Sequence, residues 1–302
     1  MNAVRITLRL STFALLTSGL VVALAVQEVL LIAAPVARRH GRSRLFGLWC
    51  TAMHPVLGLR VTTTGPMPTA PFLLVSNHLS YVDVIVYGAK LRAAFVAKSE
   101  VAGWPVVGPL ARWVGTIFVD RRVRRDVTRV NASTEAALDD GLGVVVFAEG
   151  TSSAGDEVLP FRSSLLEPAA RADHPLVAAA IGYRTPPGSP PARDVVAWWA
   201  DMTFTGHFLT LLTLPRVEAR VSFAPAEPID ADRHALADRL HRTVSGLHAG
   251  IGLGDQTGPI GGRILTPTSV SSSEGTASTP EVPGSAPDAR PAPHPEREPA
   301  CP

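Results

Sequence analysis

Short apolar runs alternate with longer amphipathic runs between residues 72 and 183, and this alternation narrows the folds that the chain can adopt. The strand-like runs cover residues 72–75, 94–97, 116–119, 144–147 and 176–183. The helix-like runs cover residues 82–91, 105–114, 125–140 and 164–171. Strands that alternate with helices are typical of a mostly parallel sheet flanked by helices. We therefore predict an α/β fold, completed by a strand at residues 217–223 and a helix from Asp230 to about residue 248.

The composition limits the size and the class of the protein. A chain of 302 residues with 46% hydrophobic residues can bury one core of roughly 200 residues and carry terminal appendages. The net charge of +2 gives no reason to expect a nucleic-acid partner. Cys50 and Cys301 lie too far out in the chain to frame a disulfide scaffold, and no Cys or His spacing indicates a metal site. We expect no metal ion and no cofactor.

The N-terminal region indicates a membrane anchor. Residues 11–37 carry one charge, Glu28, and are long enough to cross or enter a bilayer. More arginines follow this segment than precede it, which places the rest of the chain in the cytosol at the inner membrane. A signal peptide is the alternative, because Arg5 and Arg9 resemble a basic leader. The apolar run is longer than the usual h-region of about 7–15 residues, which favours the anchor.

Two further segments complete the predicted organisation. Residues 45–61 mix aromatic and basic side chains with His54, which suits a helix at the level of the lipid headgroups. From residue 251 onward Pro, Ser and Gly dominate without apolar periodicity, as in disordered chains. We predict an anchor at residues 1–58, an α/β domain at 59–250 and a disordered tail at 251–302.

Ionisable and small residues follow the predicted strands. In a parallel sheet the loops after the strands form the ligand crevice, because their carboxyl ends meet at one edge. The residues at these positions are His78, Lys98, Arg121, and Glu149 with Gly150 and Thr151. Their convergence predicts a functional site at this edge.

His78 and Asp83 lie five residues apart where a strand gives way to a helix. Five residues of regular helix would separate the two side chains by about 140°, so they meet only if His78 lies in the bend. A structural alternative is a capping box with Ser80 at N-cap and Asp83 at N3. The two interpretations are compatible, because a cap at Ser80 starts the helix after His78. The spacing alone is a weak signal.

Four stretches together resemble a known family. "NHLSYVD" (77–83), "GTIFVDR" (115–121), "FAEGTSS" (147–153) and "HPLVAAAI" (174–181) resemble, in order and spacing, the motif blocks of glycerolipid acyltransferases. This is the PlsC-like lysophospholipid acyltransferase family, with its HxxxxD and EGT signatures. The resemblance covers about residues 59–226, and four ordered blocks are far more specific than one.

The resemblance implies transfer of a fatty acyl chain from acyl-CoA or acyl carrier protein to the free hydroxyl of a membrane lysolipid. An activated thioester needs only a base for the acceptor hydroxyl, a carboxylate that orients the base, and donors for the oxyanion. It implies that His78 is the base and that Asp83 orients it. The acceptor-binding positions that it implies are Lys98, Arg121, Phe147, Glu149, Gly150 and Thr151. For Glu149, an ion pair with Arg121 that only stabilises the loop is the alternative.

The expected acceptor is 1-acylglycerol 3-phosphate, although two positions depart from the family pattern. Ser152 and Ser153 follow the EGT block where many phosphate-recognising members have Arg, and Ser164 stands where Gly is frequent. Serine cannot supply the charge of an arginine–phosphate contact. The versions of the segments around residues 149–166 and 197–212 look closer to lyso-ornithine-lipid acyltransferases, so lyso-ornithine lipid is the alternative acceptor.

Other classes of protein fit less well. "GTSSA" (150–154) fails the fifth position of the G-x-S-x-G elbow of serine hydrolases. "GLGDQTG" (252–258) has the wrong spacing for a dinucleotide fingerprint. A non-catalytic membrane adaptor would suit the anchor and the tail, but it would not need His78, Lys98 and Glu149 at one edge of the sheet.

Overall fold

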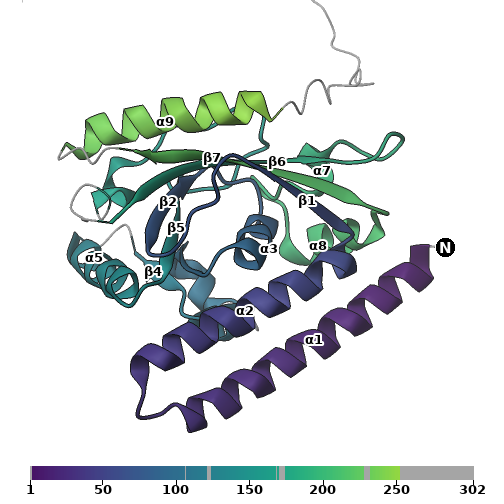
Figure 1. The fold of residues 1–302 in the computed structure, drawn as a ribbon. Coiled ribbons are helices and arrows are strands. Elements are labelled where there is room, and N and C mark those ends of the chain that lie inside the picture. Colours follow the sequence, from purple (N-terminus) through teal and green to yellow (C-terminus); the bar gives the residue numbers. More distant parts are fainter. Residues whose placement is uncertain are drawn as a thin grey trace, which may run out of the picture. The chain divides into compact units, whose positions relative to one another are not determined.

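In the computed structural model, which describes residues 2–105, 107–120, 124–167, 169, 174–227 and 232–251, seven strands form one sheet in the order β1-β7-β6-β2-β5-β3-β4 (Figure 1). The strands are β1 (Leu59–Thr64), β2 (Phe72–Ser76), β3 (Ala93–Lys98), β4 (Ile117–Val119), β5 (Gly143–Phe147), β6 (Leu176–Arg184) and β7 (Val217–Glu227). From β6 to β4 all neighbours are parallel, whereas β7 is antiparallel to β6 and parallel to β1. The prediction of a mostly parallel α/β sheet is confirmed.

Helices cover both faces of this sheet. They are α3 (Tyr81–Lys90), α4 (Val107–Trp113), α5 (Arg124–Asp139), α7 (Ala192–Val195), α8 (Phe204–Thr213) and α9 (Arg233–Gly250), with 3-10 turns η1 (Ser99–Gly103) and η2 (Ser163–Leu165). Residues of α2 (Pro35–Leu57), α3 and α8 share one apolar cluster, and residues of α5 and α9 share the other. The sheet is therefore the middle of three layers.

The central strands β2 and β5 are buried at every position, as their unbroken apolar sequences indicate. Successive residues of a strand face opposite sides, so Phe72 and Leu74 join the cluster around α3 while Leu73 and Val75 join the cluster around α5. Truncating one of these leucines to alanine should cost about 2–5 kcal/mol of stability. The two strands thus form a rigid support for the loops at their carboxyl ends.

The N-terminal region folds as two helices, α1 (Asn2–Leu30) and α2 (Pro35–Leu57), which lie side by side (Figure 1). The predicted apolar segment is present, but its bounds of 11–37 are corrected, because α1 begins at Asn2 and the chain turns between Leu30 and Pro35. Proline suits the first turn of α2, since it lacks an N–H that would have no partner there. The apolar composition indicated the segment but gave no indication of the turn between Leu30 and Pro35.

The helix predicted at residues 45–61 is also corrected. It is the second half of α2, which ends at Leu57 with Gly58 as a left-handed C-cap at φ +68°, and β1 begins at Leu59. Cys50 and Met53 are fully buried against α3, so this face packs into the core rather than against lipid headgroups.

Three differences concern the C-terminal half. A helix was predicted over residues 164–171. In this range the structure describes the 3-10 turn η2 and only part of the residues that follow it. Helix α8 was not predicted. Helix α9 begins after Asp232, whose carboxylate accepts the N–H of His234. The predicted cap, Asp230, lies outside the described residues. The predicted disordered tail also lies outside them from residue 252 onward.

Candidate active site

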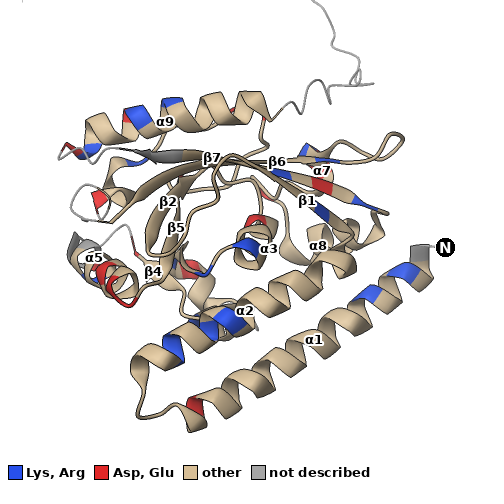
Figure 2. Cartoon of the chain, in the orientation of Figure 1, with Lys and Arg blue, Asp and Glu red and all other residues tan. Residues whose placement is uncertain are grey.

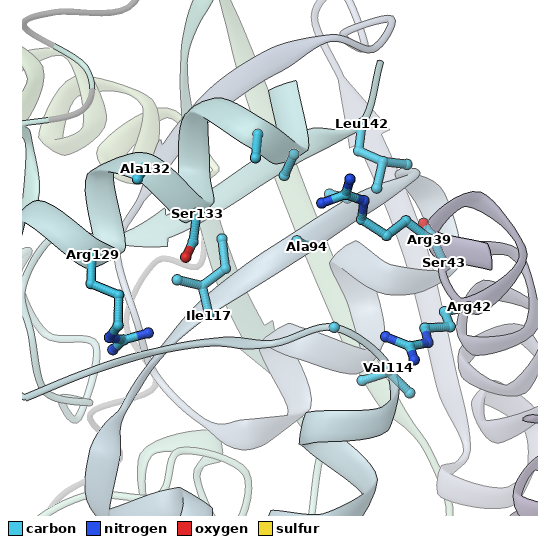
Figure 3. Close-up of a pocket in the computed structure, with 14 residues that line it drawn as sticks. Arg39, Arg42, Ser43, Ala94, Val114, Ile117, Arg129, Ala132, Ser133 and Leu142 are labelled. Carbon is cyan, nitrogen blue, oxygen red and sulfur yellow. The ribbon is translucent and has the colours of Figure 1, made fainter. Parts of the chain in front are cut away.

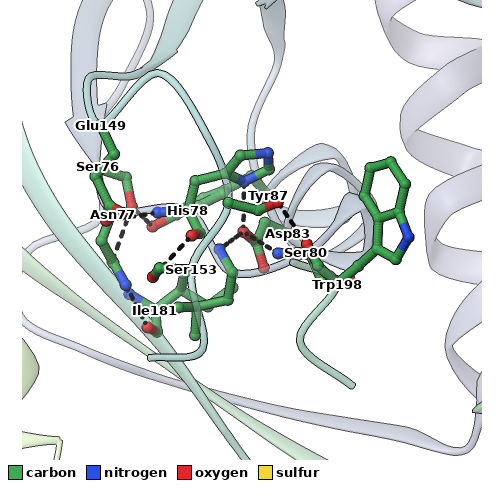
Figure 4. A network of polar contacts seen from close by, with 12 residues as sticks. Ser76, Asn77, His78, Ser80, Asp83, Tyr87, Glu149, Ser153, Ile181 and Trp198 are labelled. Carbon is green, nitrogen blue, oxygen red and sulfur yellow. Dashed lines mark hydrogen bonds and ion pairs between the residues drawn. The ribbon is translucent and has the colours of Figure 1, made fainter. Parts of the chain in front are cut away.

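His78 lies in the loop that joins β2 to α3, where its imidazole meets the carboxylate of Asp83 (Figure 4). The distance from His78 Nδ1 to Asp83 Oδ2 is 2.7 Å. A carboxylate accepts hydrogen bonds, so Nδ1 carries the proton and Nε2 of the neutral ring presents a lone pair. The side chain of His78 is 22% exposed, and that of Asp83 is fully buried. The buried carboxylate of Asp83 therefore fixes the orientation of the partly exposed imidazole of His78.

Asp83 also closes the first turn of α3. Its Oδ2 accepts the N–H groups of Leu79 at 2.7 Å and Ser80 at 3.1 Å. Ser80 is the N-cap and Asp83 is N3, as the capping-box interpretation predicts. One carboxylate thus contacts both the start of the helix and the histidine, so the cap and the His78–Asp83 contact coexist in this structure.

Tyr183, at the end of β6, completes the shell around this carboxylate. Its hydroxyl donates to Asp83 Oδ1 at 2.6 Å. Burial raises the pKa of Tyr183 well above its usual value, and the neighbouring charge of Asp83 acts in the same direction. The tyrosine is therefore a neutral donor. Sequence reasoning missed this residue, although a tyrosine at the end of an otherwise apolar buried strand is a usable signal.

Asn77 anchors the histidine loop to the sheet. Its side-chain amide donates to the carbonyl of Ile181 at 2.9 Å and accepts the N–H of the same residue at 2.8 Å. The preceding Ser76 lies 2.7 Å from the hydroxyl of the buried Tyr87, Oγ to Oη. Sequence reasoning also missed Asn77, which precedes the histidine in the first motif block. These bonds hold the loop against β6 and α3.

The strand β5 supplies the surface beneath the imidazole. Its last residue, Phe147, is in register with Ser76, and its ring stacks on that of His78 with centroids 4.1 Å apart and planes at 17°. This contact fixes the tilt of the imidazole about its bond to Asp83. Phe147, predicted as a substrate-binding residue, thus contacts the histidine itself.

Glu149 is 2% exposed and lies beneath the histidine loop. Its Oε1 accepts the backbone N–H of His78 at 3.1 Å. Burial raises the pKa of Glu149 to about 8, the charge of Asp83 adds to the rise, and the His78 N–H opposes it. Glu149 thus supports the backbone of His78, and its predicted place at the acceptor stays a prediction.

The turn after Glu149 is built around Gly150, whose φ of +75° favours glycine. Thr151 is exposed beside it. The next residues bind neighbouring loops: the N–H of Ser153 donates to the carbonyl of His78 at 2.9 Å. The EGT turn and the histidine loop are therefore one hydrogen-bonded unit.

Ser152 connects this unit to a third segment. Its hydroxyl donates to the carbonyl of Trp198, and the N–H of Trp198 donates to the carbonyl of Leu79 at 2.8 Å. The side chain of Ser152, the first residue after the EGT block, is thus engaged with the Trp198 backbone.

Lys98 lies at the carboxyl end of β3, on the same edge of the sheet. Its Nζ is 3.1 Å from Glu100 Oε1, and the two side chains are 56% and 45% exposed. Such exposed pairs contribute little stability, so the lysine can exchange this partner for a ligand at small cost. Arg121 lies outside the described residues.

Among the predicted site residues, the structure brings His78, Asp83, Phe147 and Glu149 into one network of contacts.

The described part of the chain holds no group of three His, Cys, Asp or Glu residues that could bind a metal ion.

An α/β sheet with an Asp-oriented histidine at the carboxyl edge is the arrangement of an enzyme that activates a hydroxyl group.

The comparisons with known proteins give the family. An acyltransferase family model matches residues 58–182. The chain is 36% identical over 242 residues to the lyso-ornithine lipid O-acyltransferase of Rhodobacter capsulatus, covering 75% of this chain and 82% of the relative. It is 29% identical over 195 residues to the 1-acyl-sn-glycerol-3-phosphate acyltransferase of Neisseria meningitidis, covering 64% and 75%.

A solved structure agrees in fold. The 1-acyl-sn-glycerophosphate acyltransferase PlsC of Thermotoga maritima superimposes with a TM-score of 0.59 at 18% identity, covering 83% of this chain and 98% of that one. The chain belongs to the acyltransferase family related to PlsC, as its four motif blocks indicated.

Proposed function

We propose that this acyltransferase esterifies the free hydroxyl of a membrane lysolipid with a fatty acyl chain, and that His78 is the general base. The observation that carries the proposal is the 2.7 Å hydrogen bond between His78 Nδ1 and the buried Asp83. It leaves Nε2 to take the hydroxyl proton while the hydroxyl oxygen attacks the thioester carbonyl carbon. The tetrahedral intermediate then expels the thiolate, which takes that proton from the imidazolium. Asp83 stabilises the imidazolium in between.

The acceptor that we favour is a lyso-ornithine lipid, with 1-acylglycerol 3-phosphate as the second candidate. Two relatives named lyso-ornithine lipid O-acyltransferases are 36% and 34% identical to the chain, from Rhodobacter capsulatus and Rhizobium meliloti. The Ser152 hydroxyl is engaged with Trp198, so this position offers a phosphate neither a charge nor a free donor. A charged hydrogen bond is worth about 1.5–3 kcal/mol, or roughly ten- to a hundredfold in affinity.

The donor that we propose is an acyl thioester of coenzyme A or of acyl carrier protein. Acylation assays with the purified full-length protein should pair each donor with each lysolipid, and with both lysolipids in competition. We expect the lyso-ornithine lipid to be acylated preferentially. Preference for 1-acylglycerol 3-phosphate would select the second candidate, and acylation of neither would refute the proposed function. His174→Ala, which removes a histidine at the amino end of β6, is the matched control.

We further propose that α1 lies within one leaflet of the inner membrane with the active site facing the cytosol. Residues 3–30 form one helix long and apolar enough to cross a membrane. Figure 2 shows its long uncharged stretch, with basic residues near the start and one acidic residue near the end. Large apolar side chains along it are exposed: Val4, Leu8, Leu15, Val21, Val22, Val26, Val29 and Leu30.

The start of α1 is tied to the α/β domain and its end is tied to α2, which favours a helix in the membrane plane over a crossing one. Near the start, Arg5 donates to the carbonyl of Thr213 at 2.8 Å and Arg9 to that of Leu214 at 2.7 Å. Near the end, Glu28 is 2.6 Å from Arg42 of α2. A helix held at two places about 35 Å apart along its axis cannot cross the bilayer without drawing the rest of the protein in with it.

A further inference from the structure

A cavity of about 400 Å³ lies at the amino ends of β3 and β4, between α2 and α5 (Figure 3). Ala93 and Ala94 from the start of β3 and Ile117 from the start of β4 contribute to its wall. His78 follows the carboxyl end of β2, so the cavity lies toward the opposite edge of the sheet from the candidate active site. None of its lining residues belongs to that site. The cavity is therefore distinct from the place where acyl transfer is proposed to occur.

Arginines surround this cavity from two helices. Arg39 and Arg42 approach from α2, and Arg129 approaches from α5 (Figure 3). Each also contacts a carboxylate: Arg39 pairs with Asp140, Arg42 with Glu28 and Arg129 with Asp126. A guanidinium has five N–H donors and one carboxylate engages at most two in a bidentate pair, so each arginine retains donors for a second anion.

Ser43 provides an independent indication of a ligand. It lines the cavity one residue after Arg42 and is 6% exposed. Its hydroxyl oxygen is buried and has no hydrogen-bond partner among the described residues. Such a group is unfavourable unless a ligand or water satisfies it. A hydroxyl donor beside Arg39 and Arg42, with Arg129 across the cavity, matches the acceptor oxygens of a phosphate group (Figure 3).

The position of the cavity favours a lipid phosphate over a soluble one. The turn between α1 and α2 carries exposed apolar side chains, with Leu30 and Ile32 each 74% exposed and Val36 46% exposed. Arg39 lies one helical turn after Val36. If this apolar turn enters the hydrocarbon region, the arginines lie at the level of the lipid headgroups. The alanines of the cavity wall offer a surface for the first methylene groups of a lipid.

We propose that this arginine cavity is a second, non-catalytic site that binds the phosphodiester headgroup of an anionic membrane phospholipid. Arg42 and Arg129 hold the phosphate from opposite sides, and Ser43 donates its hydroxyl to a phosphate oxygen. The site goes beyond the proposed acyl transfer, and it stands whether or not His78 is the base.

Native mass spectrometry of the full-length protein in a neutral detergent tests the site with short-chain phosphatidylglycerol as the probe and phosphatidylcholine as the reference. We expect phosphatidylglycerol to bind, and Arg42→Gln and Arg129→Gln each to weaken its binding about tenfold or more. Ser43→Ala should weaken it severalfold while the thermal midpoint stays unchanged or rises, because the buried hydroxyl has no protein partner among the described residues.

Two control variants test whether the binding is specific to this cavity. Arg193→Gln removes a surface arginine that is paired with Asp156 in the same manner, and His78→Ala alters the candidate active site. Both should bind phosphatidylglycerol like the wild type. Unchanged binding by all three cavity variants would overturn the proposal. Displacement of the lipid by equimolar coenzyme A or inorganic phosphate would overturn the lipid assignment and show a site for a soluble phosphate.

Discussion

The hydroxyl of Tyr183 in β6 donates a 2.6 Å hydrogen bond to Oδ1 of Asp83, the carboxylate whose other oxygen binds His78. The two residues are 100 positions apart in the chain. This bond makes the orientation of the imidazole depend on the docking of β6 against β2. The HxxxxD motif is therefore held by a residue outside it.

Tyr183→Phe should lower kcat about tenfold and leave KM nearly unchanged. The variant removes one hydrogen bond to Asp83 and keeps the ring, and Tyr183 contacts Asp83 rather than the proposed substrates. Steady-state kinetics of the two parameters checks this. Tyr87→Phe is the matched comparison, because this buried tyrosine bonds Ser76 at the base of the histidine loop instead of Asp83, and its loss of kcat should be smaller. Equal losses of kcat in the two variants would show that Tyr183 acts through packing in general and not through its hydrogen bond to Asp83.

Glu149→Gln should change how stability depends on pH. The folded protein raises the pKa of Glu149 to about 8 from an ordinary 4.5. Between these two values the carboxyl group ionises in the unfolded chain but stays protonated in the folded protein, so the wild type loses stability as the pH rises. Glutamine cannot ionise and escapes this loss. The thermal midpoint of the variant minus that of the wild type should therefore increase between about pH 5 and 8 and then level off. Parallel midpoint curves would contradict the prediction.

Arginines on the outer face of α1 should release the protein from membranes. Val22 and Val26 are 62% and 52% exposed, and an arginine in the hydrocarbon region costs about 2.5–3.5 kcal/mol on insertion scales. The double variant Val22→Arg with Val26→Arg should shift from the floating to the soluble fraction in vesicle flotation. Thr62→Arg with Thr64→Arg adds the same charge to exposed positions of β1 and should still float. Flotation of both variants would show that α1 does not face the lipid.

Ser152→Arg should shift the preference between acceptors toward 1-acylglycerol 3-phosphate by about ten- to a hundredfold, because it adds a charged donor at the position where the family resemblance implies arginine in phosphate-recognising members. The ratio of kcat/KM values for the two lysolipids measures the shift. Ser152→Ala is the control: it also loses the hydrogen bond to the Trp198 carbonyl but adds no charge, so the ratio should stay near that of the wild type. An unchanged ratio in the arginine variant would show that this position does not determine the acceptor.

The alternation of strands and helices was sufficient to predict the sheet and the edge at which His78 and Glu149 meet, because parallel strands deliver their following loops to one side. The partners Asn77–Ile181 and Asp83–Tyr183 were not predictable in this way. They join positions 104 and 100 residues apart, and local periodicity carries no information about such pairs. The turn between α1 and α2 was missed because apolar composition continues through it, with Pro35 as the only local signal.

The most direct measurement is the rate of acyl transfer by His78→Ala in a preparation whose thermal midpoint and vesicle flotation match those of the wild type. General-base catalysis contributes about 10²–10⁴-fold, so we predict a fall in kcat/KM of at least a hundredfold, with partial recovery on addition of free imidazole. His174→Ala, measured in parallel, should retain wild-type kcat/KM. A correctly folded His78→Ala protein that transfers acyl chains within about threefold of the wild-type rate would contradict the assignment of His78 as the base.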